Sequence, residues 1–195
     1  MVHSSFNQLS RLTKAASIAL PLACLAAPGQ AADLPPRSAQ FPARVEQLKA
    51  HIERVDRQAE QLRAPEFPAG KDWFNSPPLT FGKQLAGKIT VLDFWTYCCI
   101  NCIHILPDLA ELEERYAGYP VAFVGVHSAK FDNEKVSENI RDAVLRYEIA
   151  HPVVNDDTMH MWQRIGVRSW PSMAVVGPKG NLMLMVSGEG NKELI

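Results

Sequence analysis

Three of the four cysteines in this sequence lie within five residues of one another, at positions 98, 99 and 102. Such crowding indicates local chemistry, because a disulfide scaffold distributes its cysteines along the chain. Cys99 and Cys102 form a C-x-x-C pair, which follows the β-branched and aromatic run Ile89–Trp95 and precedes an amphipathic helical pattern. On the first turn of a helix, residues i and i+3 place their Cα atoms about 5–6 Å apart, within the range that a disulfide accepts.

The position of the pair predicts a different role for each sulfur. Unpaired N–H groups and the dipole at a helix N-terminus favour a thiolate, so Cys99 is predicted to be the attacking sulfur. Cys102 follows one turn later and is predicted to resolve the mixed disulfide. The sequence therefore predicts thiol–disulfide exchange with the Cys99–Cys102 disulfide as the redox group, without a further cofactor or a metal.

The elements that must position this pair follow from the apolar periodicity of the chain. A buried strand ends just before the cysteines, a helix begins with them, and strands and helices alternate afterwards until a hairpin. This order predicts an α/β fold with a mixed sheet and helices on its faces. The predicted segments are the strand Ile89–Trp95, a helix carrying Leu106, Leu109, Leu112 and Tyr116, a strand at 121–126, a helix at 133–147, a short strand at 153–154, a short helix capped by Asp156 or Asp157 and ending at Gly166, and the hairpin strands Ser172–Val176 and 182–186.

The first 32 residues are predicted to be a signal peptide. Arg11 and Lys14 precede an apolar run at 15–27, which is too short to span a membrane and is followed by small residues. This pattern predicts export, with the bacterial periplasm as the compartment, and no membrane association apart from the export signal.

Residues 33–70 are predicted to form a Pro-rich linker and then an amphipathic helix that ends before Pro65 and Pro68. The apolar positions of this helix, between 45 and 62, are expected either to pack against the domain or to make a weak dimer contact. Residues 71–195 are the predicted redox domain.

The composition excludes several other classes of protein. An apolar fraction of 47%, a charged fraction of 21% and a net charge of −1 are those of a globular protein rather than a disordered chain. No block of Lys and Arg stands out, so nucleic acid is not an expected partner. Serine-triad, P-loop and dinucleotide-binding glycine patterns do not occur in the sequence.

The chain resembles the thioredoxins around the cysteine pair. Asp93 lies six residues before Cys99, Pro107 lies five after Cys102, and Trp170-Pro171 precedes the strand Ser172–Val176, all as in thioredoxins. The segment 130–154 is similar to the helix–strand insertion of TlpA-like and peroxiredoxin-like relatives. The resemblance implies a thioredoxin fold, a cis Pro171 that faces the cysteines, and a final helix that is only beginning at Ile195.

Three further stretches resemble the thioredoxin-like domain that precedes the propeller of NHL-repeat proteins. These are FWTYCCINCIH at 94–104, HSAKF at 127–131 and AVLRY at 143–147, and the similarity extends over 73–194. The resemblance implies exchange with protein thiols and disulfides and with a redox donor or acceptor protein, as reductant, oxidant or isomerase. The alternative is a non-catalytic scaffold within an NHL-repeat protein.

Asp93 is expected to lie buried beneath the disulfide. Burial raises the pKa of a carboxyl group, so Asp93 is a candidate to take the proton from Cys102; the alternative is a hydrogen-bonded structural aspartate. Trp95 and Trp170 are expected to shape a groove for the partner protein or simply to pack in the core.

Cys98 stands where thioredoxin has a tryptophan, and it is expected to be a bystander near the site. A disulfide between Cys98 and Cys99 would join Cα atoms only about 3.8 Å apart and would be strained. The alternative is copper binding, because Cys98-x-x-x-Cys102 resembles the SCO-type copper chaperones, which add a distant histidine. The histidines available for that role are His127, His151 and His160.

Overall fold

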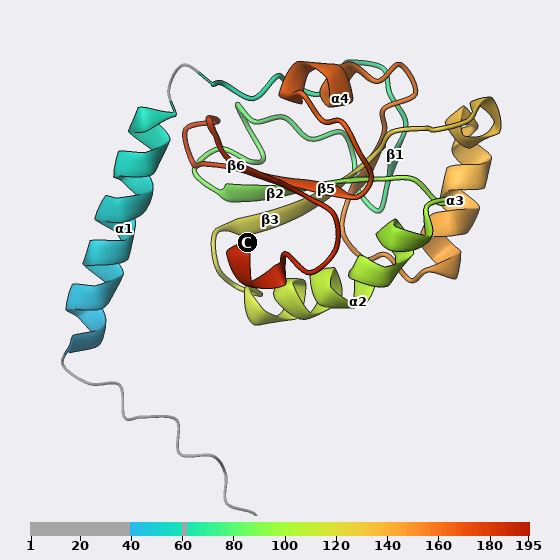
Figure 1. Ribbon diagram of the computed structural model, residues 1–195. Coiled ribbons are helices and arrows are strands. Elements are labelled where there is room, and N and C mark those ends of the chain that lie inside the picture. Colours follow the sequence, from blue (N-terminus) through green and yellow to red (C-terminus); the bar gives the residue numbers. More distant parts are fainter. Residues whose placement is uncertain (1–39, 60–61) are drawn as a thin grey trace, which may run out of the picture. The chain divides into compact units, whose positions relative to one another are not determined.

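The computed structural model describes residues 40–59 and 62–195 (Figure 1). The predicted signal peptide and most of the predicted linker lie outside this described part. None of the helices in the described ranges is both long enough and apolar enough to cross a membrane.

A six-stranded mixed sheet forms the centre of the domain, in the order β1-β4-β3-β2-β5-β6. Strand β2 pairs in parallel with β3 and antiparallel with β5, and β4 continues the parallel side. The hairpin partner β6 and the short β1 pair antiparallel at the two edges. The strands are β1 (Trp73–Phe74), β2 (Ile89–Trp95), β3 (Val121–His127), β4 (Val153–Asn155), β5 (Ser172–Val176) and β6 (Leu182–Ser187).

Helices cover both faces of the sheet, as predicted (Figure 1). Helices α2 (Ile100–Arg115) and α3 (Ser137–Arg146) lie on one face, where their apolar residues pack around Trp95, Val91 and Phe123. Helix α4 (His160–Ile165) lies on the other face and packs against Leu92 and Phe94. Because strand side chains alternate between the faces, Asp93 points to the same side as Trp95, toward α2. The fold is the predicted thioredoxin fold, with α3 and β4 as its helix–strand insertion.

The register of β2 and β3 decides which side chains meet beneath α2. Asp93 pairs with Gly125, and Trp95 pairs with His127. Residues paired in this way point to the same face of a sheet. Gly125 therefore lies beside the buried carboxylate of Asp93. Because glycine has no side chain, other residues can occupy the space above position 125.

The predicted helix at 133–147 is interrupted. A short 3₁₀ turn at Asp132–Lys135 comes first, Val136 is extended, and α3 begins at Ser137. The turn keeps Glu134 pointing inward, where its carboxylate accepts the N–H groups of Lys130 and Phe131. The prediction of one continuous helix is wrong here because these local hydrogen bonds, together with those from Thr96 and Cys98, hold Glu134 inward and outweigh the helical pattern.

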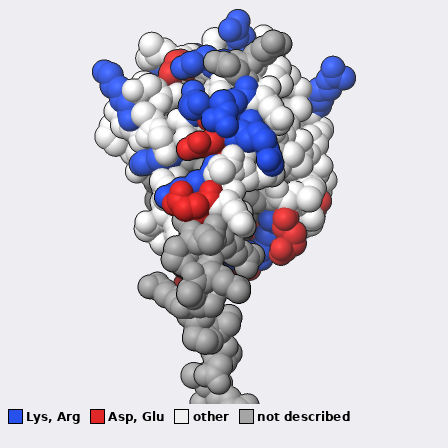
Figure 2. Space-filling model, turned by 90° about the vertical axis from the view of Figure 1, so that its left-hand side faces the viewer, with Lys and Arg blue, Asp and Glu red and all other residues white. Residues whose placement is uncertain are grey.

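Helix α1 (Gln40–Gln58) ends seven residues before Pro65. Its Asp56 is buried and accepts a hydrogen bond of 2.9 Å from Asn181 Nδ2, whereas Leu48 on the predicted seam is exposed. Figure 2 shows basic and acidic side chains next to one another on the face that it presents, and ion pairs such as Lys49–Glu46 occur along α1. A dimer contact through residues 45–62 stays a prediction.

A second 3₁₀ turn, η2 (Lys192–Leu194), lies at the position where a final helix was expected to begin. The side chain of Ile195 packs against the group of apolar residues between α2 and the sheet. Lys192 forms ion pairs with Asp108 and Glu111 of α2. These contacts attach the turn to the helix that carries the cysteines.

Candidate active site

The two cysteines of the C-x-x-C pair begin α2. Cys99 is the N-cap residue and is partly exposed, while Cys102 lies one turn inside and is fully buried. The carbonyl of Cys99 accepts the backbone N–H groups of Cys102 at 3.0 Å and Ile103 at 3.2 Å. The three cysteines within the described residues are free thiols. The structure thus places one sulfur where a partner can reach it and the other directly behind it.

Burial raises the pKa of the Cys102 thiol far above its ordinary value. A hydrogen bond with Cys99 and the negative charge of Asp93 act in the same direction, and a hydrogen bond with the backbone of Thr96 opposes them. Cys102 therefore needs a group that takes its proton before it can attack a mixed disulfide.

Asp93 lies beneath the pair and is only 2% exposed. Neither of its carboxylate oxygens has a hydrogen-bond partner among the residues that the structure describes. Burial raises the pKa of Asp93 to about 7, the charge of His151 lowers it, and the carboxylate of Glu113 raises it. A carboxyl group that titrates near neutral pH is suited to exchange a proton with a thiol.

Cys98 is exposed, but its backbone N–H is bound by a second buried carboxylate, that of Glu134. Glu134 accepts hydrogen bonds from the Thr96 hydroxyl and from the backbone N–H of Cys98 at 3.1 Å, in addition to those of Lys130 and Phe131. Burial and the nearby Glu134 carboxylate raise the pKa of the Cys98 thiol to about 11. Cys98 is therefore held as a protonated thiol beside Cys99.

The same hydrogen bonds keep Glu134 ionised. Burial alone would raise its pKa, but the bonds from Cys98, Thr96 and the two backbone N–H groups lower it overall. Nothing in the sequence alone separated Glu134 from the other acidic residues of the predicted helix. The only local feature that distinguishes Glu134 is structural: it lies in the 3₁₀ turn that interrupts the predicted helix.

Trp170 and Pro171 directly precede β5, whose Ser172 pairs with Phe94 of β2, five residues before Cys99. The Trp170–Pro171 peptide bond is cis, as predicted. Trp170 packs with Cys99 in one apolar group, its indole N–H donates to the carbonyl of Ser128 at 3.0 Å, and its ring lies 4.2 Å from that of Trp162. Pro107 lies within α2 and lines a cavity described below.

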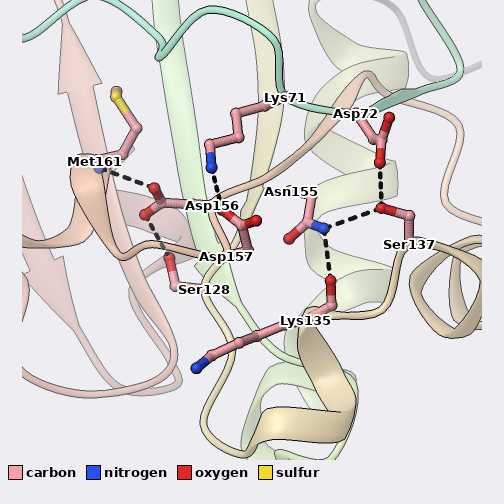
Figure 3. A network of polar contacts seen from close by, with 9 residues as sticks. All are labelled: Lys71, Asp72, Ser128, Lys135, Ser137, Asn155, Asp156, Asp157 and Met161. Carbon is pink, nitrogen blue, oxygen red and sulfur yellow. Dashed lines mark hydrogen bonds and ion pairs between the residues drawn. The ribbon is translucent and has the colours of Figure 1, made fainter.

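A network of polar side chains supports this edge of the site (Figure 3). Asp156 accepts hydrogen bonds from the Ser128 hydroxyl at 3.2 Å and from the N–H groups of Met161 and Trp162 at 3.1 Å. The N-cap residue of α4 is Met159 rather than the predicted Asp156 or Asp157, but the Asp156 side chain still accepts two backbone N–H groups of the first turn. It also holds Ser128, whose carbonyl positions Trp170.

The histidines proposed for copper do not gather around the cysteines. His127 is buried between Tyr97 and Trp95, and burial lowers its pKa to about 4. His151 contacts Glu113 instead, and His160 is on α4. Across residues 40–59 and 62–195, no three His, Cys, Asp or Glu side chains are grouped so that they could hold a metal ion.

A partly exposed cysteine at a helix N-cap, a buried thiol one turn later and a cis proline before the strand that pairs with β2 are together typical of a thioredoxin-like site. Residues 87–182 match the model of a sequence family described as thioredoxin-like. A solved structure of a thioredoxin-like superfamily protein superposes with a TM-score of 0.58 at 24% identity, covering 68% of this chain and 90% of that one. Residues 87–182 therefore resemble the thioredoxin-like family, and the described part of the chain shares the fold of its solved members.

Among its relatives, the chain is similar to proteins that are much longer. It is 57% identical over 129 residues to Protein SUPPRESSOR OF QUENCHING 1, chloroplastic, of Arabidopsis thaliana, covering 66% of this chain and 12% of that protein. It is 52% identical over 141 residues to human NHL repeat-containing protein 2, covering 71% of this chain and 19% of that protein. The thiol-disulfide oxidoreductase ResA of Halalkalibacterium halodurans is 23% identical over 113 residues, covering 58% of this chain and 61% of that protein.

These relatives contradict the predicted compartment. The plant protein is described as chloroplastic and the relative of 52% identity is human, so the assignment to a bacterial periplasm was wrong. The prediction depended on a short basic and apolar segment, and composition of that kind does not specify one compartment.

Proposed function

We propose that the domain is a thiol–disulfide oxidoreductase that exchanges electrons with protein partners through Cys99 and Cys102. The observation that supports this most is the arrangement of the two sulfurs at the start of α2, one partly exposed and one buried above Asp93. The name of ResA and the match to the thioredoxin-like family support the same chemistry.

The exchange proceeds in two steps. The Cys99 thiolate attacks a disulfide of the partner, a Cys99–partner disulfide forms, and the first partner sulfur leaves as a thiolate. Cys102 then gives its proton to Asp93 and attacks the Cys99 sulfur. The Cys99–Cys102 disulfide forms, the second partner sulfur leaves, and the partner has gained two electrons. Run in reverse, the same steps oxidise a partner dithiol.

An insulin-reduction assay with the full chain tests this proposal. The wild type and Cys98→Ser are expected to reduce insulin, because Cys98 is held protonated and lies outside the pair. Cys99→Ser is expected to fall to background, and Cys102→Ser is expected to accumulate a mixed disulfide through Cys99. Equal background turnover in the wild type and in Cys99→Ser would reject the proposal and favour a scaffold.

A further inference from the structure

A carboxylate and a histidine connect the underside of the cysteine pair with the surface of the protein. His151 precedes β4, and its side chain is 5% exposed; its Nδ1 lies 2.7 Å from Oε1 of Glu113 on α2, whose side chain is 24% exposed. Both residues line a cavity of about 530 Å³ between α2 and the end of α3, together with Leu106, Pro107 and Tyr147. Glu113 therefore contacts solvent, while His151 is buried behind it.

The buried end of the pair reaches the strand next to Asp93. A Cβ atom at position 125 would lie 3.1 Å from His151 Nε2, 3.1 Å from Trp95 Nε1 and 3.0 Å from Val153. Gly125 is the register partner of Asp93 on the neighbouring strand. The imidazole thus occupies the space that a side chain at 125 would fill, on the face of the sheet that carries the carboxylate.

The polar atoms around this point lack partners within the described part of the chain. They are both oxygens of Asp93, the indole N–H of Trp95 and Nε2 of His151. Buried polar groups in folded proteins are nearly always paired, and one water with two to four such partners is a common way to pair them. Trp95 Nε1 and His151 Nε2 lie at the same point above Gly125, and the acceptor oxygens of Asp93 belong to the register partner of that glycine.

We propose that His151 and Glu113 form a proton path that connects Asp93 with solvent at the cavity beside α2. The proposal depends on the proposed exchange at Cys99 and Cys102 and concerns how its proton leaves the buried site. His151 and Glu113 act through Asp93 and do not touch the reacting sulfurs.

The proton balance of the path closes over one redox cycle. Glu113 accepts a hydrogen bond from Nδ1, so the resting imidazole carries its proton there and Nε2 is free to accept. When Cys102 resolves the mixed disulfide, its proton passes to Asp93 and then to Nε2, while the Nδ1 proton passes to Glu113 and solvent. When the Cys99–Cys102 disulfide is reduced again, Glu113 returns a proton to Nδ1 and the Nε2 proton goes back through Asp93 to Cys102. The tautomer of His151 is then restored.

The charged groups near Asp93 are consistent with this direction of transfer. Cys102 and Glu113 approach it from α2, His151 from the segment before β4, and His127 lies on the same face of β3. His127 stays neutral near pH 7 because burial lowers its pKa to about 4. Asp93, with a pKa of about 7, can both accept and release a proton under those conditions.

Ellman's reagent separates the two thiol steps in the full chain carrying Cys24→Ser and Cys98→Ser. Attack by Cys99 releases the first aromatic thiolate, and resolution by Cys102 releases the second. In His151→Ala, the first phase is expected to stay within about twofold, and the second to slow by about tenfold or more near pH 7, because one proton-transfer group is lost. His104→Ala, which removes an exposed histidine, is the matched control.

Chemical rescue distinguishes proton transfer from packing. Imidazole added to His151→Ala is expected to restore the second phase, while pyrazole, a ring of the same size but a much weaker base, is expected not to. Glu113→Gln should slow the second phase as well, with the exposed neighbour Glu114→Gln as its control. An unchanged second phase in both His151→Ala and Glu113→Gln, or equal rescue by the two rings, would overturn the proton path. Absence of a second phase with His151 in place would instead reject the proposed exchange.

Discussion

Asp93→Asn should change the pH dependence of stability, because the pKa of this buried carboxyl group differs between the folded and unfolded states. The pKa of Asp93 rises from 3.8 to about 7 in the folded protein, chiefly through burial. Between these two values the folded state holds a proton that the unfolded state has released. The stabilisation is therefore fully present below pH 3.8 and is lost as the pH rises through about 7. At about 1.36 kcal/mol per pH unit, the difference between 3.8 and about 7 corresponds to about 4 kcal/mol.

Urea unfolding of the reduced wild type and of Asp93→Asn, at closely spaced pH values between about 4 and 8, measures this effect. Because all other titrating groups are shared, the difference between the two unfolding free energies isolates Asp93. That difference should shift in favour of the variant by about 4 kcal/mol across the range, with the steepest change below pH 7. Parallel curves for the two proteins would refute the reasoning. The same variant should resolve mixed disulfides at least about 100-fold more slowly near pH 7, so it gains stability while it loses function.

Three other substitutions test the structure around the site. Glu134→Gln should lower the unfolding free energy by about 3 kcal/mol, because an amide group replaces an acceptor of several buried donors; urea unfolding measures this. The same change should lower the pKa of Cys98 below about 11, so that iodoacetamide labels Cys98 faster at a fixed alkaline pH; unchanged labelling would contradict the role of Glu134. Gly125→Ala should lower the unfolding free energy by about 1–3 kcal/mol, since its Cβ would lie 3.1 Å from His151 Nε2. An unchanged unfolding free energy would contradict the close packing at this position. Asp56→Ala should lower the unfolding free energy by about 1–3 kcal/mol, measured in the same way, because it removes the carboxylate that accepts from the Asn181 amide and from the backbone N–H of Lys179, and a cost near zero would argue against its anchoring of α1.

The parts of the fold that the sequence predicts best are those whose elements carry a strong local pattern. The run Ile89–Trp95 is apolar, β-branched and continuous, and it forms a strand with those bounds. The cysteine pair was predicted at a helix N-terminus because a strand ends and a helical pattern begins there, and Cys99 is the N-cap. The two-residue β1 was not predicted, because so short a strand has no periodicity to detect and depends on β4 for its pairing.

The parts of the site that could not be predicted depend on contacts between distant segments. Glu113 and His151 are separated by 38 residues and meet only because α2 and the segment before β4 lie side by side. His151 was considered as a copper ligand, since nothing near it in the chain indicates that its ring would lie next to Gly125. Glu134 looked like one more charged residue on a helix surface. Its inward orientation depends on donors from the end of β2 and from the segment after β3.

Two buried carboxylates lie near the cysteines, and their different surroundings give the same chemical group opposite roles. Glu134 receives a hydrogen bond at each of several positions, stays ionised and holds Cys98 protonated. Asp93 receives none from the described residues and titrates near pH 7. Environments that separate the pKa values of two like groups also separate their functions, as general acid–base chemistry requires. In the proposed exchange, the three neighbouring thiols then behave differently: Cys98 stays protonated, Cys99 attacks the partner, and Cys102 reacts only when Asp93 is able to take its proton.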